Sequence, residues 1–199
     1  MSMILSLVAL GDTNISRALA DPPLVWQVIA PDDPEMYEAA RAAQNGNLLS
    51  RIFGRVRSNR ASQLELSSFE GGSVDLDKAW HGIHYLLTHT AWEGDYPLDL
   101  LVNGGTPVGD IDVGYGPART FTAAETREAY EALALLSDED LKQRFDPADM
   151  MAKEIYPEIW DRDPEEDDSL AYLIENVETL RSFLRETAQA NLGLVVYLG

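Results

Sequence analysis

The stretch "LGLVVYLG", residues 192–199, is a short apolar run of the kind that forms a buried strand. A matching run, "MILSLVAL" at residues 3–10, is ended by the turn signal "GDTN" and also predicts a buried strand. Because both runs are short and apolar, we expect them in one small mixed sheet with several helices packed against it. The N-terminal strand is expected at the centre of that sheet.

Helices are predicted by start signals and by apolar spacing. The closing strand follows a long amphipathic pattern over residues 170–184. Thr122 with Glu125 forms a capping box, Ser137 repeats the signal with an acid three residues on, and Asp146 precedes a proline at a first helical position. Further helices are expected at residues 13–20 and 34–46. The fold class is therefore α+β, in a single domain spanning residues 1–199.

The segment from Glu93 to Arg119, "EGDYPLDLLVNGGTPVGDIDVGYGPAR", is rich in Gly, Asp and Pro. Such a composition is too interrupted for a long element and predicts loops around one or two short strands.

Composition excludes several classes of function. The chain has 34 acidic and 15 basic residues, a formal net charge of −19, so its average field repels nucleic acid and anionic lipid. It has no cysteine, which removes disulfides, thiolate metal sites and thiol nucleophiles. Its apolar opening lacks a basic leader region, and no run approaches the roughly 18 apolar residues of a membrane span. We expect a cytoplasmic protein that binds neither nucleic acid nor membrane.

Two motifs fail at decisive positions. "GYGPAR", residues 114–119, places Arg119 where a dinucleotide-binding loop needs its third glycine. Asp161, Asp163 and Glu165 imitate the start of a calcium loop, but Glu166 stands in place of the required glycine. We therefore expect no cofactor and no metal.

The chain's three histidines lie within "LDKAWHGIHYLLTHT", residues 76–90. If a helix follows Asp75 as its N-cap, Asp77, His81 and His84 share one shoulder of it. Two interpretations give this shoulder a function: a zinc-type site, or His84 as a general base oriented by Asp77. The favoured interpretation is structural, with His84 half-buried and bonded to backbone, His81 solvated and Asp77 in the first helical turn.

Tyr115 and Arg119 are the second set of candidates. A glycine-rich turn holds backbone close to what it faces, and the Arg119 guanidinium is a bidentate fork for a small anion. The alternative, slightly favoured, is that Arg119 pairs with a carboxylate such as Asp110 or Asp112 and fixes the loop to the helical layer. Trp80 and His81 are further candidates for ligand binding.

The motifs also carry a resemblance. The pattern Asp77-Lys78-x-Trp80-x-x-x-His84-x-Leu86-Leu87-Thr88 is followed by "GYGPAR" and by "IYP" at residues 155–157, with Trp160 after it. In this order, over nearly the whole chain, these residues resemble the YfbM-like family of small bacterial proteins, a family of unknown function. The resemblance implies a single α+β domain and no assigned activity.

Two departures from the family pattern stand out. Where the family usually has glycine after "LLT", this chain has His89, which we interpret as a substituted left-handed helix cap. The region of residues 41–62 is longer and more basic than the family form, with arginines at 41, 51, 55, 57 and 60. This arginine-rich segment could meet an acidic partner, although pairing with the protein's own carboxylates is favoured.

Two hypotheses about function follow. In the first, the protein is a non-catalytic binding or interaction protein whose acidic surface docks a protein partner, such as a basic one, as an immunity-like or regulatory factor would. In the second, it is an enzyme or small-anion binder, with His84 as general base and Arg119 as anion clamp, helped by Asp77 and Tyr115. The first is favoured because no catalytic signature is present.

Overall fold

The structure, a computed structural model, describes residues 2–44, 63–67 and 69–199. Most of the arginine-rich segment therefore lies outside the described residues. The elements in chain order are β1 (Leu5–Leu10), α1 (Asp12–Ala20), η1 (Pro22–Val25), α2 (Trp26–Ile29), α3 (Pro34–Gln44), β2 (Ser73–Asp75), α4 (Trp80–Thr88), β3 (Thr106–Asp112), β4 (Pro117–Phe121), α5 (Ala123–Ala134), α6 (Asp138–Gln143), α7 (Pro147–Ala152), α8 (Ser169–Gln189) and β5 (Gly193–Leu198).

The five strands form one sheet in the order β2-β1-β5-β4-β3. As predicted, the two terminal strands are neighbours: β1 pairs with β5 from Leu5 opposite Leu198 to Leu10 opposite Gly193. Two details differ from expectation. Every pairing is antiparallel, so the sheet is not mixed, and β5 rather than β1 is its central strand.

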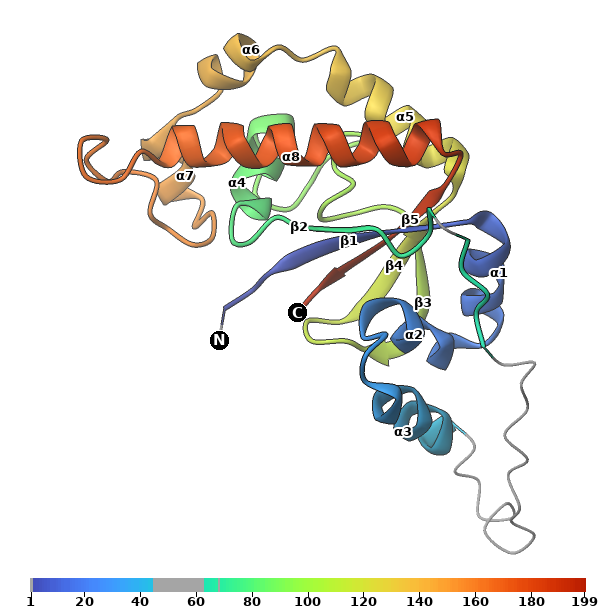
Figure 1. Ribbon diagram of the computed structural model, residues 1–199. Coiled ribbons are helices and arrows are strands. Elements are labelled where there is room, and N and C mark those ends of the chain that lie inside the picture. The colour runs from blue at the N-terminus through green and yellow to red at the C-terminus, as the bar shows by residue number, and fades with distance from the viewer. Residues whose placement is uncertain (1, 45–62, 68) are drawn as a thin grey trace, which may run out of the picture.

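Helices cover both faces of the sheet (Figure 1). Alternate residues of a strand point to opposite faces, so Leu5 and Leu7 pack with α4, α5 and α8, while Val8 and Leu10 pack with α1 and α2. The long helix α8 runs across the first face and buries Leu173, Val177, Leu180 and Leu184, at helical spacing. Each such buried leucine stabilises the fold by about 1.5–3 kcal/mol.

The predicted helix start signals are present. The hydroxyl of Thr122 accepts from the Glu125 N–H, and the Glu125 carboxylate accepts from the Thr122 N–H, which closes the capping box of α5. Ser137 with Asp140 caps α6 in the same way, and the Asp146 side chain caps α7. These caps satisfy backbone donors that the helix itself leaves unpaired.

Arg41 is the one arginine of the arginine-rich segment that the structure describes. Its guanidinium donates to the Asp21 carboxylate at 2.9 Å and also contacts Tyr37. This contact agrees with pairing to the protein's own carboxylates at that position. In the described part of the chain, no helix is both long and apolar enough to cross a membrane.

Candidate functional site

Three of the candidate residues, Trp80, Tyr115 and Arg119, line the same pocket of about 310 Å³. We call it the aromatic pocket: its walls include Trp80, Trp92, Asn103, Tyr115 and Arg119. Its apolar side is formed by residues of the two terminal strands, Leu5, Val196 and Leu198. The pocket therefore joins the start of α4, the loop before β3, the β3–β4 hairpin and the sheet.

Arg119 lies on β4, paired with Val196 of β5, and is partly buried. Its terminal nitrogens donate to four backbone carbonyls: Leu100 at 3.2 Å, Leu101 at 2.8 Å, Gly104 at 3.0 Å and Asn103. Burial lowers the pKa of the guanidinium to about 10, so it stays charged at neutral pH. Arg119 thus ties residues 100–104 to the sheet. The expected carboxylate partners were wrong, because the acceptors are carbonyl oxygens.

Asp99 is the carboxylate whose charge acts on Arg119. It is 4% exposed, and one of its carboxylate oxygens, Oδ1, has no hydrogen-bond partner among the described residues. Burial raises the pKa of Asp99, and the positive charge of Arg119 opposes that rise. Asp99 could not be identified from the sequence, because nothing in a Gly- and Asp-rich loop distinguishes one buried aspartate from its exposed neighbours.

Tyr115 is held at the pocket by the turn of the β3–β4 hairpin. The Asp112 carboxylate accepts from the N–H groups of Gly114 and Gly116, at 2.9 and 3.0 Å. The Tyr115 N–H donates to the Leu198 carbonyl at 3.1 Å. Gly114 has a φ of +146°, and a Cβ there would lie 2.8 Å from the Gly199 Cα. Only glycine fits this approach, and the ring of Tyr115 remains 45% exposed.

Trp92 is a pocket residue that the sequence analysis did not identify. Its side chain is 54% exposed, and its carbonyl accepts from the Asn103 side-chain amide at 2.6 Å. The Trp92 ring lies 6.3 Å from that of Trp80 and 4.4 Å from that of His81. A tryptophan next to a long Gly- and Asp-rich loop was the available signal, because exposed tryptophans mark binding surfaces more often than other residues do.

His81 is buried, not solvated as predicted. One ring nitrogen, Nε2, lies 2.7 Å from the Ala91 carbonyl, and the other, Nδ1, accepts from the Tyr156 N–H at 3.0 Å. These partners define a neutral ring that donates from Nε2. The ring stacks on Trp80, with centroids 4.8 Å apart. His81 supports the pocket wall through Trp80 and does not line the pocket itself.

His84 is fully buried, and neither ring nitrogen has a hydrogen-bond partner among the described residues. The Glu93 backbone does act on the ring and raises its pKa against the effect of burial, so the expected backbone contact is present without a hydrogen bond of good geometry. Burial, assisted by the neighbouring His81, lowers the pKa of His84 to about 4. His84 does not line the aromatic pocket, so the histidine and Arg119 do not share that cavity.

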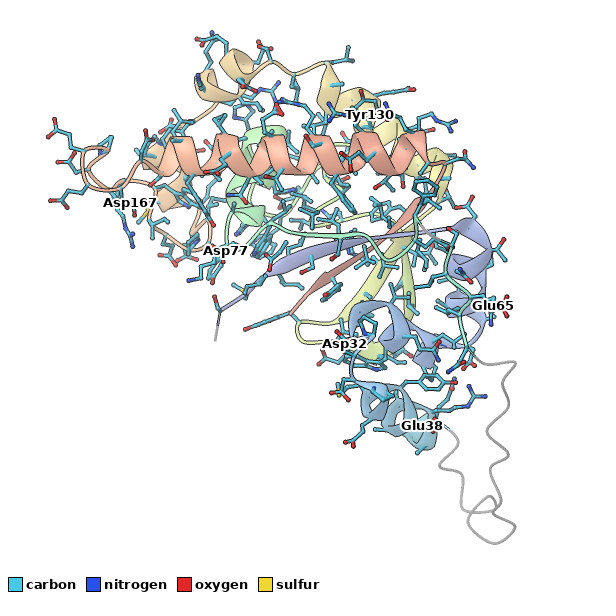
Figure 2. The ribbon with its side chains drawn as sticks, in the orientation of Figure 1. Asp32, Glu38, Glu65, Asp77, Tyr130 and Asp167 are labelled. Carbon is cyan, nitrogen blue, oxygen red and sulfur yellow. The ribbon has the colours of Figure 1, made fainter. Side chains whose placement is uncertain are left out.

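Asp77 lies outside the helix that was expected to carry it. Asp75 ends β2 rather than capping a helix; its carboxylate accepts from the Asp77 N–H, and α4 begins only at Trp80. Asp77, which is labelled in Figure 2, has a φ of +46°. Its own carboxylate accepts from the Tyr172 hydroxyl of α8 at 2.9 Å. The predicted shoulder of Asp77, His81 and His84 is therefore wrong, and Asp77 is tied to α8.

His89 has a φ of +61° at the C-cap of α4, and its N–H donates to the Tyr85 carbonyl at 2.7 Å. The interpretation of His89 as a left-handed cap is confirmed. Across the described ranges, no group of three or more His, Asp or Glu side chains is placed to hold a metal ion.

Comparison with known proteins places the whole chain in one family. The family model DUF1877, a domain of unknown function, matches residues 1–197. The chain is also similar to the crystal structure of a protein of unknown function, YfbM from Escherichia coli. The identity is 17% and the TM-score is 0.63, over 98% of this chain and 99% of that one. At this identity the likeness shows the fold alone.

No curated protein matches the chain. The family model covers the α4 region, the β3–β4 hairpin and the "IYP" segment with Trp160, which are the segments on which the resemblance to the YfbM-like family was based. The α+β fold of the chain is like that of YfbM, and the chain belongs to the DUF1877 family, a family of unknown function.

Proposed function

We propose that this protein is a non-catalytic binding protein and that the aromatic pocket takes a small ligand. The observation that carries the proposal is convergence: Trp80 at the start of α4, and Tyr115 with Arg119 in the β3–β4 hairpin, come from two segments far apart in the chain and line one pocket. A volume of about 310 Å³ is at the small end of the range for ligand sites, and such sites combine apolar and aromatic walls with a few polar groups.

The positions of His84 and Asp77 do not support the catalytic alternative. A general base must reach the proton that it removes, yet the ring of His84 is sealed from solvent and lies outside the pocket of Arg119. With a pKa of about 4, His84 is also a weak base at neutral pH. Asp77, its expected orienting partner, contacts Tyr172 instead.

A protein partner for the acidic surface is a second proposal, supported by the net charge of −19. The labelled acidic residues are spread over the molecule, with Glu38 and Glu65 near α3 and α1, and Asp77 and Asp167 near the other end (Figure 2). Because net charge alone identifies no particular surface, the aromatic pocket is the more specific site to test.

A fragment screen by NMR tests the first proposal. We expect small planar compounds at millimolar concentration to shift the indole N–H signal of Trp92 and the amide signal of Tyr115. Replacing Tyr115 by Ala should weaken this binding at least about fivefold, since the exposed ring supplies stacking area. Phe69→Ala is the matched control, because Phe69 is 72% exposed and does not line the pocket.

The Tyr115→Ala variant is expected to fold, since the ring is 45% exposed and the hydrogen bond to Leu198 uses only the backbone N–H of residue 115. A screen in which no fragment perturbs the signals of Trp92 and Tyr115 contradicts the proposed function. Binding that is unchanged in Tyr115→Ala, or lost equally in Phe69→Ala, also contradicts it.

A further inference from the structure

The charged side chain in the wall of the aromatic pocket is a cation, Arg119, in a protein whose net charge is −19. The chain carries 34 acidic residues in 199, but among the described residues that line the pocket none is Asp or Glu, and Arg119 is the only charged one. A pocket wall drawn evenly from this sequence would include carboxylates. The local field therefore favours a negative ligand in a protein whose average surface repels one.

The amount of negative charge that the pocket can compensate is small. All four carbonyl contacts of Arg119 use its terminal nitrogens, so Nε–H is the guanidinium donor that these contacts leave over. The buried carboxylate of Asp99 already offsets part of the positive charge. One partly compensated cation with one remaining donor suits a monoanion, whereas a phosphate dianion needs more charge and more donors.

The shape of the ligand follows from the walls. Trp92 and Tyr115 line the pocket and are each about half exposed to solvent, while Leu5, Val196 and Leu198 provide an apolar surface. Aromatic side chains interact best with flat rings, in offset-stacked or edge-to-face arrangements. A planar, conjugated body therefore uses this surface better than a saturated one of the same size.

We propose, building on the function proposed above, that the ligand of the aromatic pocket is a small planar carboxylate. Its conjugated or aromatic ring packs between Trp92 and Tyr115, and its single carboxylate lies on the Arg119 side. The ligand is bound and not transformed.

The test uses benzoate, benzamide and benzamidine on the wild-type protein, because these have nearly the same shape and carry charges of −1, 0 and +1. Cyclohexanecarboxylate keeps the charge of benzoate without a flat ring, and phenyl phosphate keeps the ring with a dianion. Binding is followed by NMR through the signals of Trp92 and Tyr115. We expect benzoate to bind at least about tenfold more tightly than each of the other four compounds.

The salt dependence of binding is a second readout. It needs no variant of Arg119, whose replacement would leave four backbone carbonyls without their hydrogen-bond donor. Raising NaCl from about 20 to about 200 mM should weaken benzoate binding several-fold and leave benzamide binding unchanged, because only the first depends on charge. Tyr115→Ala should weaken the binding of both compounds, which would show that both bind in the pocket.

The outcomes separate the two proposals. If benzamide or benzamidine binds at the pocket as tightly as benzoate, the pocket is a ligand site but its ligand need not carry a carboxylate. If cyclohexanecarboxylate binds as tightly as benzoate, the ligand need not be planar. If phenyl phosphate binds more tightly than benzoate, the ligand is not a monoanion. If neither this series nor the wider fragment screen perturbs Trp92 and Tyr115, the proposed function itself fails.

Discussion

His81 and His84 lie three residues apart on α4 and have opposite environments. His81 makes a hydrogen bond with each ring nitrogen, to Ala91 and Tyr156, whereas His84 is equally buried and makes none among the described residues. A buried polar group without a partner loses its bonds to water and gains nothing in return. The two histidines should therefore respond in opposite directions to the same substitution.

We expect His84→Leu to raise the free energy of unfolding by up to about 1–3 kcal/mol, because it removes two buried unpaired nitrogens. His81→Leu is the matched comparison. It should lower the same quantity by about 2–4 kcal/mol, since it leaves the Ala91 carbonyl and the Tyr156 N–H without their partner. Urea unfolding at pH 7 measures both. Strong destabilisation by His84→Leu would show that the His84 ring nitrogens do have hydrogen-bond partners in the folded protein.

The pH dependence of stability gives a second prediction for His84. Its pKa is about 4 in the folded protein against 6.5 in an exposed histidine, so between these values the unfolded chain binds a proton that the folded protein does not. Stability is therefore lost as the pH falls below 6.5. At pH 5 the His84 contribution is about 2 kcal/mol relative to pH 7. The His84→Leu variant keeps every carboxylate, so its loss of stability over this range should be smaller than that of wild type by this amount; parallel losses would contradict it.

Among the secondary-structure elements, α4 depends on a close approach at Gly82. A Cβ at this position would lie 2.6 Å from the Trp160 ring and 2.7 Å from the Leu173 side chain of α8. Both neighbours are fully buried and cannot move aside easily. The absence of a side chain at residue 82 therefore lets α4 pack directly against Trp160 and α8.

Gly82→Ala should destabilise the protein by about 1–3 kcal/mol, because overpacking outweighs the gain of about 1 kcal/mol in helix propensity. Gly72→Ala is the control: a Cβ there meets only the Phe69 carbonyl, at 3.9 Å, and its effect should stay within about 0.5 kcal/mol. Thermal and urea unfolding measure both variants. A more stable Gly82→Ala protein would mean that α4 and α8 can separate without cost.

The whole molecule carries a net charge of −19, so its thermal stability should depend on the salt concentration. Like charges repel most in the compact state, and dissolved salt screens them. The Tm should therefore rise by a few degrees between low ionic strength and about 150 mM NaCl. A double variant, Asp32→Asn with Glu38→Gln, removes two exposed charges that make no ion pair with another described residue, and should show a smaller rise. A Tm that falls with salt would show that attractive pairs dominate.

The elements that could be predicted from the sequence are those formed by near neighbours in the chain. The capping boxes at Thr122 and Ser137 join residues three positions apart, and the apolar spacing of α8 repeats within each turn. Such contacts form whatever the rest of the chain does, so their sequence signals are reliable. The pairing of the two terminal strands could also be predicted from the sequence, because each run is apolar and must be covered on both faces.

The predictions that failed concern side chains whose partners are distant in sequence. The hydrogen bond between His81 and Tyr156 spans 75 residues, and the one between Tyr172 and Asp77 spans 95. From the sequence, Asp77, His81 and His84 share a helical shoulder; in the fold, α4 starts later and Tyr172 holds Asp77. Composition and periodicity thus sufficed for the fold class, and the motifs that resemble the YfbM-like family pointed to the family. Packing decided the burial of His84, the carbonyl partners of Arg119 and the pocket with Trp92. The physical reason is that local patterns encode local hydrogen bonds and buried faces, whereas a pocket exists only where separate segments meet.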